Sequence, residues 1–392
     1  MRNHTWRRLS KSTGIAAVAA AVALTAACGS DSGTESSGFD GAIGPVDLSQ
    51  NCPAKIVVQT DWNPEAEHGH LYQLLGPDNT TINAENKRVV GPLFDGGEYT
   101  GVDLEIRSGG PAIGNQTVTS QMYADPDIML GYVDTDQAVQ NSQSNPTTAV
   151  MAPLDISPQM IMWDPATYPQ VQGIADLKGV DARVLYFEGS TYMSYLTGSG
   201  ILSPEQVDGS YDGTPANFVA DQGRAAQQGF ASSEPMVYEE EVEGWMKPVD
   251  YQLVHDVGFP IYKSALSVRS GDLEANAACL EQLVPVLQRG AVDYMANPDA
   301  ADAVIVDAVE QYNTGWVYTD ANAEYAVRTM AEQNLVGNGP NATIGDFDPA
   351  RVERVIEVTT PIFAEQGTPV ADGLTAEAVS TNRFIDTSVG MP

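Results

Sequence analysis

The sequence predicts an α/β protein with two lobes and a ligand cleft between them. Three observations lead to this prediction: the length of 392 residues, the alternation of strand-like and helix-like segments, and two extended stretches that interrupt the alternation. This length is enough for two domains, each with its own core. The interruptions are expected where the chain crosses from one lobe to the other, and a cleft between lobes suits a small molecule.

The amino-terminal end has the features of a bacterial export signal. Residues 1–11 carry basic and no acidic side chains, and the apolar stretch 14–23 is too short to span a bilayer. The segment Leu24–Cys28 resembles a lipobox. We therefore expect residues 1–27 to be removed as a lipoprotein signal peptide and Cys28 to be acylated, which would anchor the chain on the outer face of the cytoplasmic membrane. The alternative is an ordinary secretory signal that leaves Cys28 as a free thiol.

The chain is strongly acidic, and this limits its partners. It has 52 Asp and Glu residues against 19 Lys and Arg, for a formal net charge of −33. Such a surface argues against nucleic acid and anionic lipid headgroups as partners. We therefore expect no nucleic acid and no contact with the membrane other than the lipid anchor.

Two cysteines remain when Cys28 is set aside. Cys52 and Cys279 would lie in a compartment that permits oxidation, so they are candidates for one disulfide. The alternative is two isolated buried cysteines.

Residues 28–51 are rich in Gly, Ser and Asp and are expected to form a flexible tether. The β-branched run in 54–60 predicts a buried strand, and the apolar spacing in 68–75 predicts a helix. The polar loop 61–68 then lies at the carboxyl end of a strand, the edge where open α/β sheets bind ligands.

Strands and helices alternate from there to the end of the second lobe. Strands are expected at 102–107, 128–132 and 182–187, and helices at 113–123, 191–196 and 218–228. The stretch 151–163 contains prolines that suit a crossing better than a helix interior, and 251–257 would cross back.

The chain is expected to be mainly helical after the second crossing, because Gly and Pro clusters separate long segments with helical spacing. These helices are expected at 274–288, 300–312, 323–334 and 349–366. The expected lobes are therefore 52–155 with 258–392 for lobe 1, and 156–257 for lobe 2.

Several short motifs resemble those of a known family. The lipobox, Asp176–Gly179 and Ser232–Pro235 resemble the substrate-binding lipoproteins of bacterial ABC importers, which implies a type II periplasmic-binding-protein-like fold. Within that group, Gln59–Pro64 with His68 is similar to the first-strand motif of the pyrimidine-precursor-binding proteins of thiamine salvage, the pyrimidine synthase-like family. The resemblance extends over most of the chain, from about residue 55 to 366.

The resemblance implies part of a ligand site in the loop 61–68. It implies that Trp62 stacks on a planar heterocycle, with Asp61 beside it and His68 in the same motif. The alternative for Trp62 is a partly exposed core residue. The chain departs from the family at Glu65–Glu67, where the family has Asn-Thr-Asn, and this departure leaves the exact ligand open.

Other candidate ligand-binding residues come from later segments. The resemblance implies that Glu234 bonds to ring nitrogens or an amino group, and that Tyr192 or Tyr238 completes the aromatic stack. The alternative for Glu234 is a capping or surface acid. Asp134 follows the expected strand 128–132, and Ser190 begins a helix whose backbone N–H groups could bind the ligand or could simply be capped by its hydroxyl.

We expect no metal and no cofactor. His68 and His70 with the neighbouring glutamates offer atoms that suit zinc, but residues two apart on a helix point to different faces. An anionic ligand would need a basic residue in the cleft, for which the candidates are Arg107, Arg183 and Arg224.

The function expected from these features is an extracytoplasmic solute receptor of an ABC importer. It would bind a small planar heterocycle, such as an aminopyrimidine thiamine precursor, by closing its cleft about hinges near 155–158 and 253–260. It would act as a monomer and deliver the ligand to the permease and ATPase subunits. The same receptor class could instead take riboflavin-like, sulfonate or nitrate-type ligands.

Two other function classes remain as alternatives. One is a pyrimidine synthase-like enzyme, although the chain has no cysteine cluster, nucleophile elbow or phosphate-binding loop. The other is a structural surface lipoprotein, which would need neither two crossings nor a cleft. We expect no enzymatic activity.

Overall fold

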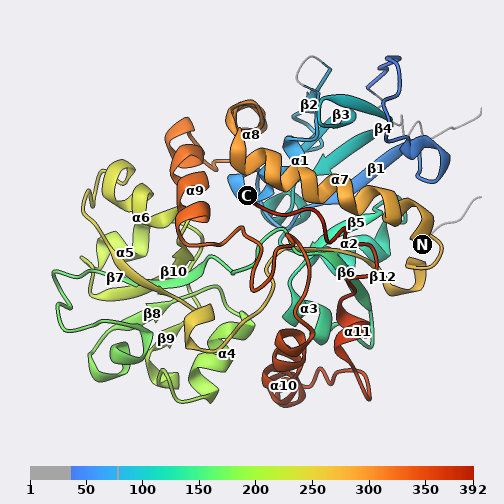
Figure 1. Ribbon diagram of the computed structural model, residues 1–392. Helices are drawn as coiled ribbons and strands as arrows, with labels where there is room; N and C mark the ends of the chain where they lie inside the picture. Colours follow the sequence, from blue (N-terminus) through green and yellow to red (C-terminus); the bar gives the residue numbers. More distant parts are fainter. Residues whose placement is uncertain (1–36, 77–78) are drawn as a thin grey trace, which may run out of the picture. The chain divides into compact units, whose positions relative to one another are not determined.

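Two β-sheets organise the part of the chain that the computed structural model describes, residues 37–76 and 79–392 (Figure 1). In that part, the first sheet has the strand order β2-β3-β4-β1-β5-β12-β6 and the second has the order β11-β7-β10-β8-β9. The first sheet consists of β1 (Lys55–Gln59), β2 (Thr81–Asn83), β3 (Arg88–Asp95), β4 (Glu98–Arg107), β5 (Leu130–Val133), β6 (Thr147–Met151) and β12 (Ala265–Arg269). The second consists of β7 (Gln159–Trp163), β8 (Arg183–Leu185), β9 (Val207–Asp208), β10 (Ala225–Phe230) and β11 (Asp250–Leu253).

Helices pack around both sheets. Helices α4, α5 and α6 belong to the segment that holds the second sheet, whereas the long helices α7, α8 and α10 follow the return to the first sheet (Figure 1). Their bounds are α1 (Gly69–Tyr72), α2 (Val118–Ala124), α3 (Thr135–Gln140), α4 (Thr191–Gly198), α5 (Ala216–Ala220), α6 (Glu234–Met236), α7 (Ala277–Ala296), α8 (Asp299–Tyr312), α9 (Asp320–Glu332), α10 (Pro349–Glu365) and α11 (Ala376–Val379). The mixed α/β fold with two sheets agrees with the fold class that the sequence predicts.

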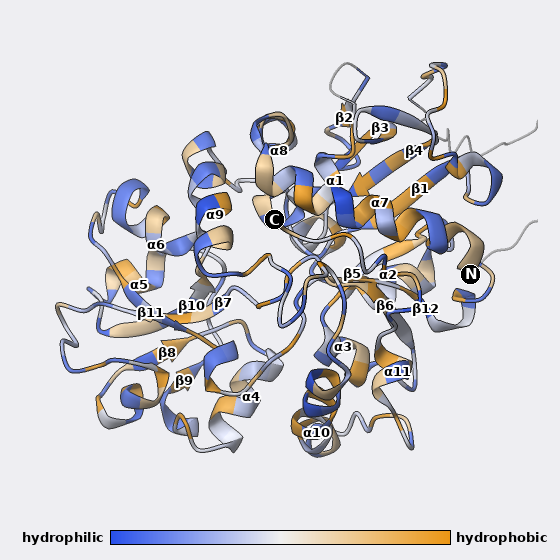
Figure 2. Ribbon diagram, in the orientation of Figure 1, coloured by the Kyte–Doolittle hydropathy of each residue, from blue (hydrophilic) through white to orange (hydrophobic). Residues whose placement is uncertain are grey.

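Strand β1 explains where the first candidate loop lies. It pairs in parallel with β4 on one side and β5 on the other, so it is an interior strand of the sheet. Its Ile56 and Val58 are fully buried, as expected for a strand covered on both faces. Figure 2 shows the hydrophobic character of β1 and β4. The polar loop after β1 is therefore held at the carboxyl edge of the parallel strands.

The chain passes between the sheets twice, from β6 to β7 and from β11 to β12. We propose 52–155 with 258–392 as lobe 1 and 156–257 as lobe 2, because the strands of each sheet fall within these bounds. Helices α9 and α10 follow the second crossing but also contact lobe 2. Helix α10 packs against α4, and the Tyr325 hydroxyl of α9 donates to the Ala231 carbonyl of lobe 2 at 3.2 Å.

The end of the expected tether packs against lobe 1. Ile43 forms a parallel bridge with Tyr99 of β4, and the Ser37 N–H donates to an Asp103 carboxylate oxygen at 2.9 Å. Leu48, in a short 3-10 helix, is fully buried. Residues 37–51 are therefore attached to the sheet by backbone and side-chain hydrogen bonds as well as by buried apolar side chains.

Two of the expected helices differ from the structure. The helix expected at 113–123 begins only at Val118, where the Thr117 hydroxyl accepts from the Ser120 N–H as an N-cap. The helix expected at 218–228 is wrong over its second half, because α5 ends at Ala220 and β10 begins at Ala225. Strand β10 lies between β7 and β8, and its interior position, which local spacing does not reveal, decides its conformation.

The expected lipid anchor lies outside the described residues. The signal peptide 1–27 and Cys28 fall in the segment 1–36, of which no structure is described. Among residues 37–76 and 79–392, no helix combines the length and the apolar character that a membrane crossing needs.

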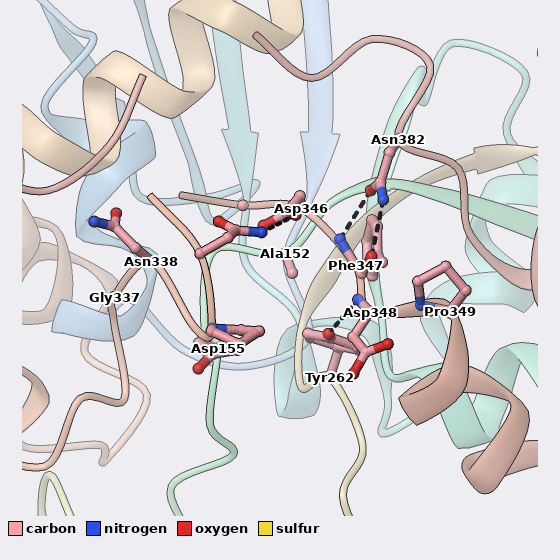
Figure 3. Close-up of a pocket in the computed structure, with 13 residues that line it drawn as sticks. Ala152, Asp155, Tyr262, Gly337, Asn338, Asp346, Phe347, Asp348, Pro349 and Asn382 are labelled. Atoms are coloured by element: carbon pink, nitrogen blue, oxygen red, sulfur yellow. Dashed lines mark hydrogen bonds between the residues drawn. The ribbon is translucent and has the colours of Figure 1, made fainter. Parts of the chain in front are cut away.

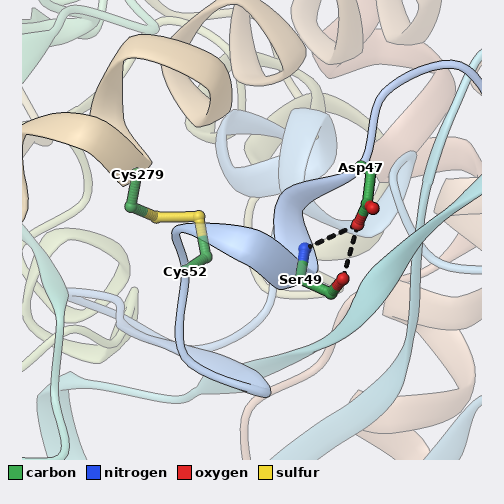
Figure 4. Close-up of a disulfide and its surroundings, with 4 residues drawn as sticks. All are labelled: Asp47, Ser49, Cys52 and Cys279. Atoms are coloured by element: carbon green, nitrogen blue, oxygen red, sulfur yellow. Dashed lines mark hydrogen bonds between the residues drawn. A yellow bond between two sulfur atoms is a disulfide. The ribbon is translucent and has the colours of Figure 1, made fainter.

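Cys52 and Cys279 form a disulfide with their Cα atoms 4.7 Å apart (Figure 4). It joins the segment just before β1 to the first turn of α7, which lie 227 residues apart in the sequence. The bond therefore ties the start of lobe 1 to the helix that follows the second crossing.

Reduction of this disulfide is expected to lower the melting temperature by about 3 to 5 °C. A disulfide typically contributes about 2 to 4 kcal/mol, and the unfolding entropy of a chain this long converts each kcal/mol into roughly 1.3 °C. Differential scanning calorimetry with and without a reductant measures the effect. The Cys52→Ser/Cys279→Ser variant is the control, since its melting temperature should not respond to the reductant. An unchanged melting temperature in the native protein would contradict a bonded pair.

Candidate functional site

A cavity of about 410 Å³ is lined by residues from both lobes. Lobe 1 contributes the loops after β1 and β5, the start of α3 and the turn before β12, and lobe 2 contributes the turn before α4 and the segment around α6. The predicted residues that line it are Asp61, Trp62, Asp134, Ser190, Tyr192 and Glu234. Other lining residues that carry the argument below are Glu65, Asp136, Phe187, Tyr211, Lys263 and Trp316.

Trp62 forms an aromatic wall of this cavity. Its ring centroid lies 6.1 Å from that of Phe187 in lobe 2 and 6.0 Å from that of Trp316, with the Trp316 ring edge-on. Gly110 supports the indole from behind. Its φ of +52° favours glycine, and a Cβ at this position would come within 2.5 Å of the Trp62 ring. The backbone next to β4 therefore fixes where the indole can lie.

Lys263 lies between two carboxylates of lobe 1. Its Nζ donates to Asp61 Oδ2 at 2.9 Å and to Asp134 Oδ2 at 2.9 Å. Asp61 also accepts from the Ser264 hydroxyl at 2.8 Å. Although burial opposes the charge, Lys263 and His68 hold the pKa of Asp61 well below its usual range. Asp61 therefore stays ionised, and most of its acceptor capacity is used within the protein.

His68 lies behind Asp61 and does not line the cavity. Its Nε2 is 3.1 Å from Asp61 Oδ1, its side chain is almost fully buried, and its ring lies 5.0 Å from that of Tyr132. The structure places it where it can orient Asp61, whereas the family motif alone does not say whether it faces the ligand.

Glu234 faces the cavity from lobe 2. It is the first residue of α6, and its Oε2 accepts from the Phe230 N–H at 2.6 Å. Burial raises the pKa of Glu234 to about 7, and the nearby charge of Glu67 contributes in the same direction. Near neutral pH this side chain can bond to a ligand either as a neutral acid or as a carboxylate.

The two predicted tyrosines have different surroundings. Tyr192 lines the cavity, and its hydroxyl donates to Gln228 Oε1 at 2.7 Å. Tyr238 is only 2% exposed and packs edge-on against Phe218 in the core of lobe 2, so it does not line the cavity. Tyr211 and Phe187 stand on the cavity wall instead, with ring centroids 4.8 Å apart.

Ser190 occupies the N-cap position of α4 without capping it. Its hydroxyl donates to the Phe187 carbonyl at 2.7 Å, and its side chain makes no cap bond. Both Ser190 and Thr191 line the cavity. The first turn of α4 therefore faces the space where a ligand would lie.

The basic residues expected as anion ligands lie elsewhere. Arg107 pairs with Glu105 and Asp125, and Arg183 and Arg224 pair with aspartates on the surface of lobe 2. None of the three lines the cavity. The sequence did not reveal Lys263, because its place depends on strand direction. Strand β12 is antiparallel to β5, so Lys263, two residues before β12, lies at the edge where β5 ends.

The described residues contain no group of three or more His, Cys, Asp or Glu side chains placed to hold a metal ion. His70 packs against Tyr132, with ring centroids 6.0 Å apart, and burial lowers its pKa to about 3. His70 is therefore a neutral core residue.

A second cavity, of about 400 Å³, lies beside the two crossings (Figure 3). Asp155 from the first crossing and Tyr262 from the end of the second line it. Arg351 of α10 holds both: it pairs with Asp155 at 3.1 Å, donates to the Pro260 carbonyl at 2.7 Å and lies 3.7 Å over the Tyr262 ring. This side chain joins the two crossings to one helix of lobe 1.

Comparisons with known proteins agree with this architecture. The family model NMT1/THI5 like matches residues 98–301, more than half of the chain. No curated protein sequence matches. A putative sulfonate ABC transporter periplasmic sulfonate-binding protein SsuA from Methylobacillus flagellatus is similar in structure, with a TM-score of 0.51 and 10% identity over 84% of this chain and 92% of that one.

A second solved structure is the periplasmic aliphatic sulphonate binding protein SsuA from Escherichia coli, with a TM-score of 0.50 and 14% identity over 81% of this chain and 89% of that one. At these identities the likeness shows the fold, which is that of periplasmic binding proteins. The family resemblance drawn from the sequence is confirmed, and the chain belongs to the NMT1/THI5-like family.

Proposed function

We propose that this protein is the solute receptor of an ABC importer and binds a small planar heterocycle, with an aminopyrimidine thiamine precursor as the leading candidate. The observation that carries the proposal is one cavity lined by Trp62 of lobe 1 and Glu234 of lobe 2. An indole face favours flat ligands, because an offset stack contributes about 0.5 to 1.5 kcal/mol beyond burial. A carboxyl group then selects among flat ligands through hydrogen bonds to ring nitrogens and amino groups.

The walls favour a heterocycle over an anion. Among the described residues that line the cavity, Lys263 is the single lysine or arginine. Two aspartates already neutralise its charge. His255 also lines the cavity, but burial lowers its pKa to about 4, so it is neutral at pH 7. A sulfonate or nitrate would therefore enter a site with little positive charge to offset its desolvation.

Contacts across the gap support capture by closure. Ser232 of lobe 2 donates its hydroxyl proton to Glu67 of lobe 1, and Trp62 faces Phe187 across the cavity. The hinge is proposed at the crossings 155–158 and 253–260, next to the contacts of Arg351. We further propose that the receptor is a monomer anchored through Cys28 and that it delivers its ligand to a permease and its ATPase.

A thermal-shift panel on the purified protein without residues 1–27 tests the proposed function. The panel contains the aminopyrimidine moiety of thiamine, riboflavin, an alkanesulfonate and nitrate. A ligand at 100 times its dissociation constant stabilises the folded state by about 2.7 kcal/mol. We expect the aminopyrimidine to raise the melting temperature most. A shift with the sulfonate alone would overturn the ligand assignment while leaving the receptor class in place, and no shift with any of the four would count against both.

A further inference from the structure

We propose that the ligand of this cavity is a cation, and that Glu65 and Asp136 are the carboxylates that recognise its positive charge. This inference rests on the proposed function and narrows it, because a planar heterocycle can be neutral or charged. Neither residue belongs to the matching part of the family motif. Both side chains are buried acids of the cavity wall that have no positively charged partner among the lining residues.

The cavity wall carries an excess of carboxyl groups. Within the described residues, its acidic members outnumber its lysines and arginines by six to one: Asp61, Glu65, Asp134, Asp136, Glu188 and Glu234 against Lys263. Lys263 donates a hydrogen bond to each of Asp61 and Asp134, so these two carboxylates have a positively charged partner. Four carboxyl groups are then left facing the cavity without a cationic partner among its lining residues.

Glu65 is 7% exposed, although it faces the cavity. The basic group near it is His68, whose Nε2 lies 3.8 Å from Glu65 Oε1, too far for a hydrogen bond. Burial and the neighbouring charges of Glu67, Asp61 and Glu234 raise the pKa of Glu65 well above its usual value, with Lys263 opposing the shift. Glu234 lines the same cavity from lobe 2.

Asp136 supplies an independent observation on the same wall. It lies in the first turn of α3 and is 5% exposed, and its Oδ1 is buried without a hydrogen-bond partner. Burial and the charge of Asp134 raise the pKa of Asp136 to about 7, while Thr191 and Lys263 act in the opposite direction. A buried acceptor without a partner destabilises the fold, and a donor from the ligand would remove this cost.

The aromatic residues on the wall suit the same charge. Trp62, Trp316, Phe187 and Tyr211 line the cavity, and aromatic faces attract a cation within about 6 Å of the ring centre. A flat cation can therefore stack on an indole and direct its N–H groups to the carboxylates. A neutral ligand of the same shape would offer these acids no positive charge.

The test compares two flat probes of nearly equal size, benzamidine and benzamide. Benzamidine is a cation at neutral pH, and benzamide is neutral. Isothermal titration calorimetry is expected to give a dissociation constant at least tenfold lower for benzamidine. Equal affinities, tighter binding of benzamide, or no measurable binding of either probe would overturn the inference.

Variants assign the effect to the two carboxylates. Glu65→Gln and Asp136→Asn are each expected to weaken benzamidine at least fivefold and to leave benzamide within twofold. Asp293→Asn is the control, because Asp293 is a half-buried acid of α7 that does not line the cavity. An equal loss in Asp293→Asn, or no loss in both test variants, would remove Glu65 and Asp136 from the recognition of charge.

The outcome can be separated from that of the proposed function. If the aminopyrimidine binds but benzamidine is no better than benzamide, the cation inference fails and the heterocycle receptor stands. If benzamidine binds as expected and the aminopyrimidine does not, the charge preference stands and the ligand assignment fails.

Discussion

Replacement of Lys263 by Met is expected to lower the free energy of unfolding by about 3 to 5 kcal/mol. The Nζ atom bonds to Asp61 and Asp134 at 2.9 Å each, and both aspartates are largely shielded from water. Removal of one partner of a buried ionic cluster leaves uncompensated charge, which costs about this amount. Urea denaturation followed by circular dichroism measures the change.

Two further variants make this result specific. Lys247→Met is the control, since Lys247 is exposed and makes a cation–π contact with Trp245, so its loss should change stability by no more than about 1 kcal/mol. Lys263→Met combined with Asp134→Asn should regain part of the loss, because one buried charge disappears with its partner. A loss in Lys263→Met no larger than that in Lys247→Met would show that the cluster does not carry the expected energy.

Replacement of Trp62 by Ala is expected to weaken binding of the aminopyrimidine by about 2 to 4 kcal/mol, or roughly 30-fold to 1000-fold. The substitution removes both the stacking face and the apolar area that the ligand would bury. Trp62 is half-buried and projects into the cavity, so the fold should persist. Isothermal titration calorimetry gives the affinity, and the melting temperature reports on the fold.

Conservative and remote variants complete this experiment. Trp62→Phe keeps an aromatic face and should retain most of the affinity. Tyr123→Ala removes an exposed aromatic side chain outside the cavity and should leave the affinity unchanged. If Trp62→Ala binds the aminopyrimidine within about twofold of the native protein, the indole is not part of the binding site.

Local sequence was sufficient for the first strand and the loop after it. The β-branched run around Val57 can be buried only as an interior strand, and the polar residues that follow must then leave the sheet at its carboxyl edge. The position of Trp62 directly after this strand therefore predicts a ligand contact. The same reasoning fails for Ala225–Gln228, where small and amide side chains carry no clear period and the neighbouring strands decide the conformation.

The aromatic partners of Trp62 could not be predicted in this way. Tyr238 follows Glu234 closely in sequence, yet the irregular helical turn Val237–Glu241 directs it into the core against Phe218. Phe187 and Trp316 come from distant segments, one in each lobe. Phe187 meets Trp62 because the lobes approach each other, and Trp316 meets it because the chain after the second crossing returns to lobe 1. The direction of a side chain at the end of an element depends on packing that spacing does not encode.

The sequence by itself determined the alternating α/β architecture, the two crossings, the acidic character and the importance of the loop after the first strand. These features depend on the periodicity of apolar residues and on composition, which each segment carries locally. Only the tertiary structure decided that Lys263 pairs with Asp61 and Asp134, and that Glu65 and Asp136 face the cavity without a cationic partner among its lining residues. These side chains come together through the strand order and through contacts between residues more than a hundred positions apart. Their burial and their charged neighbours therefore exist only in the assembled fold.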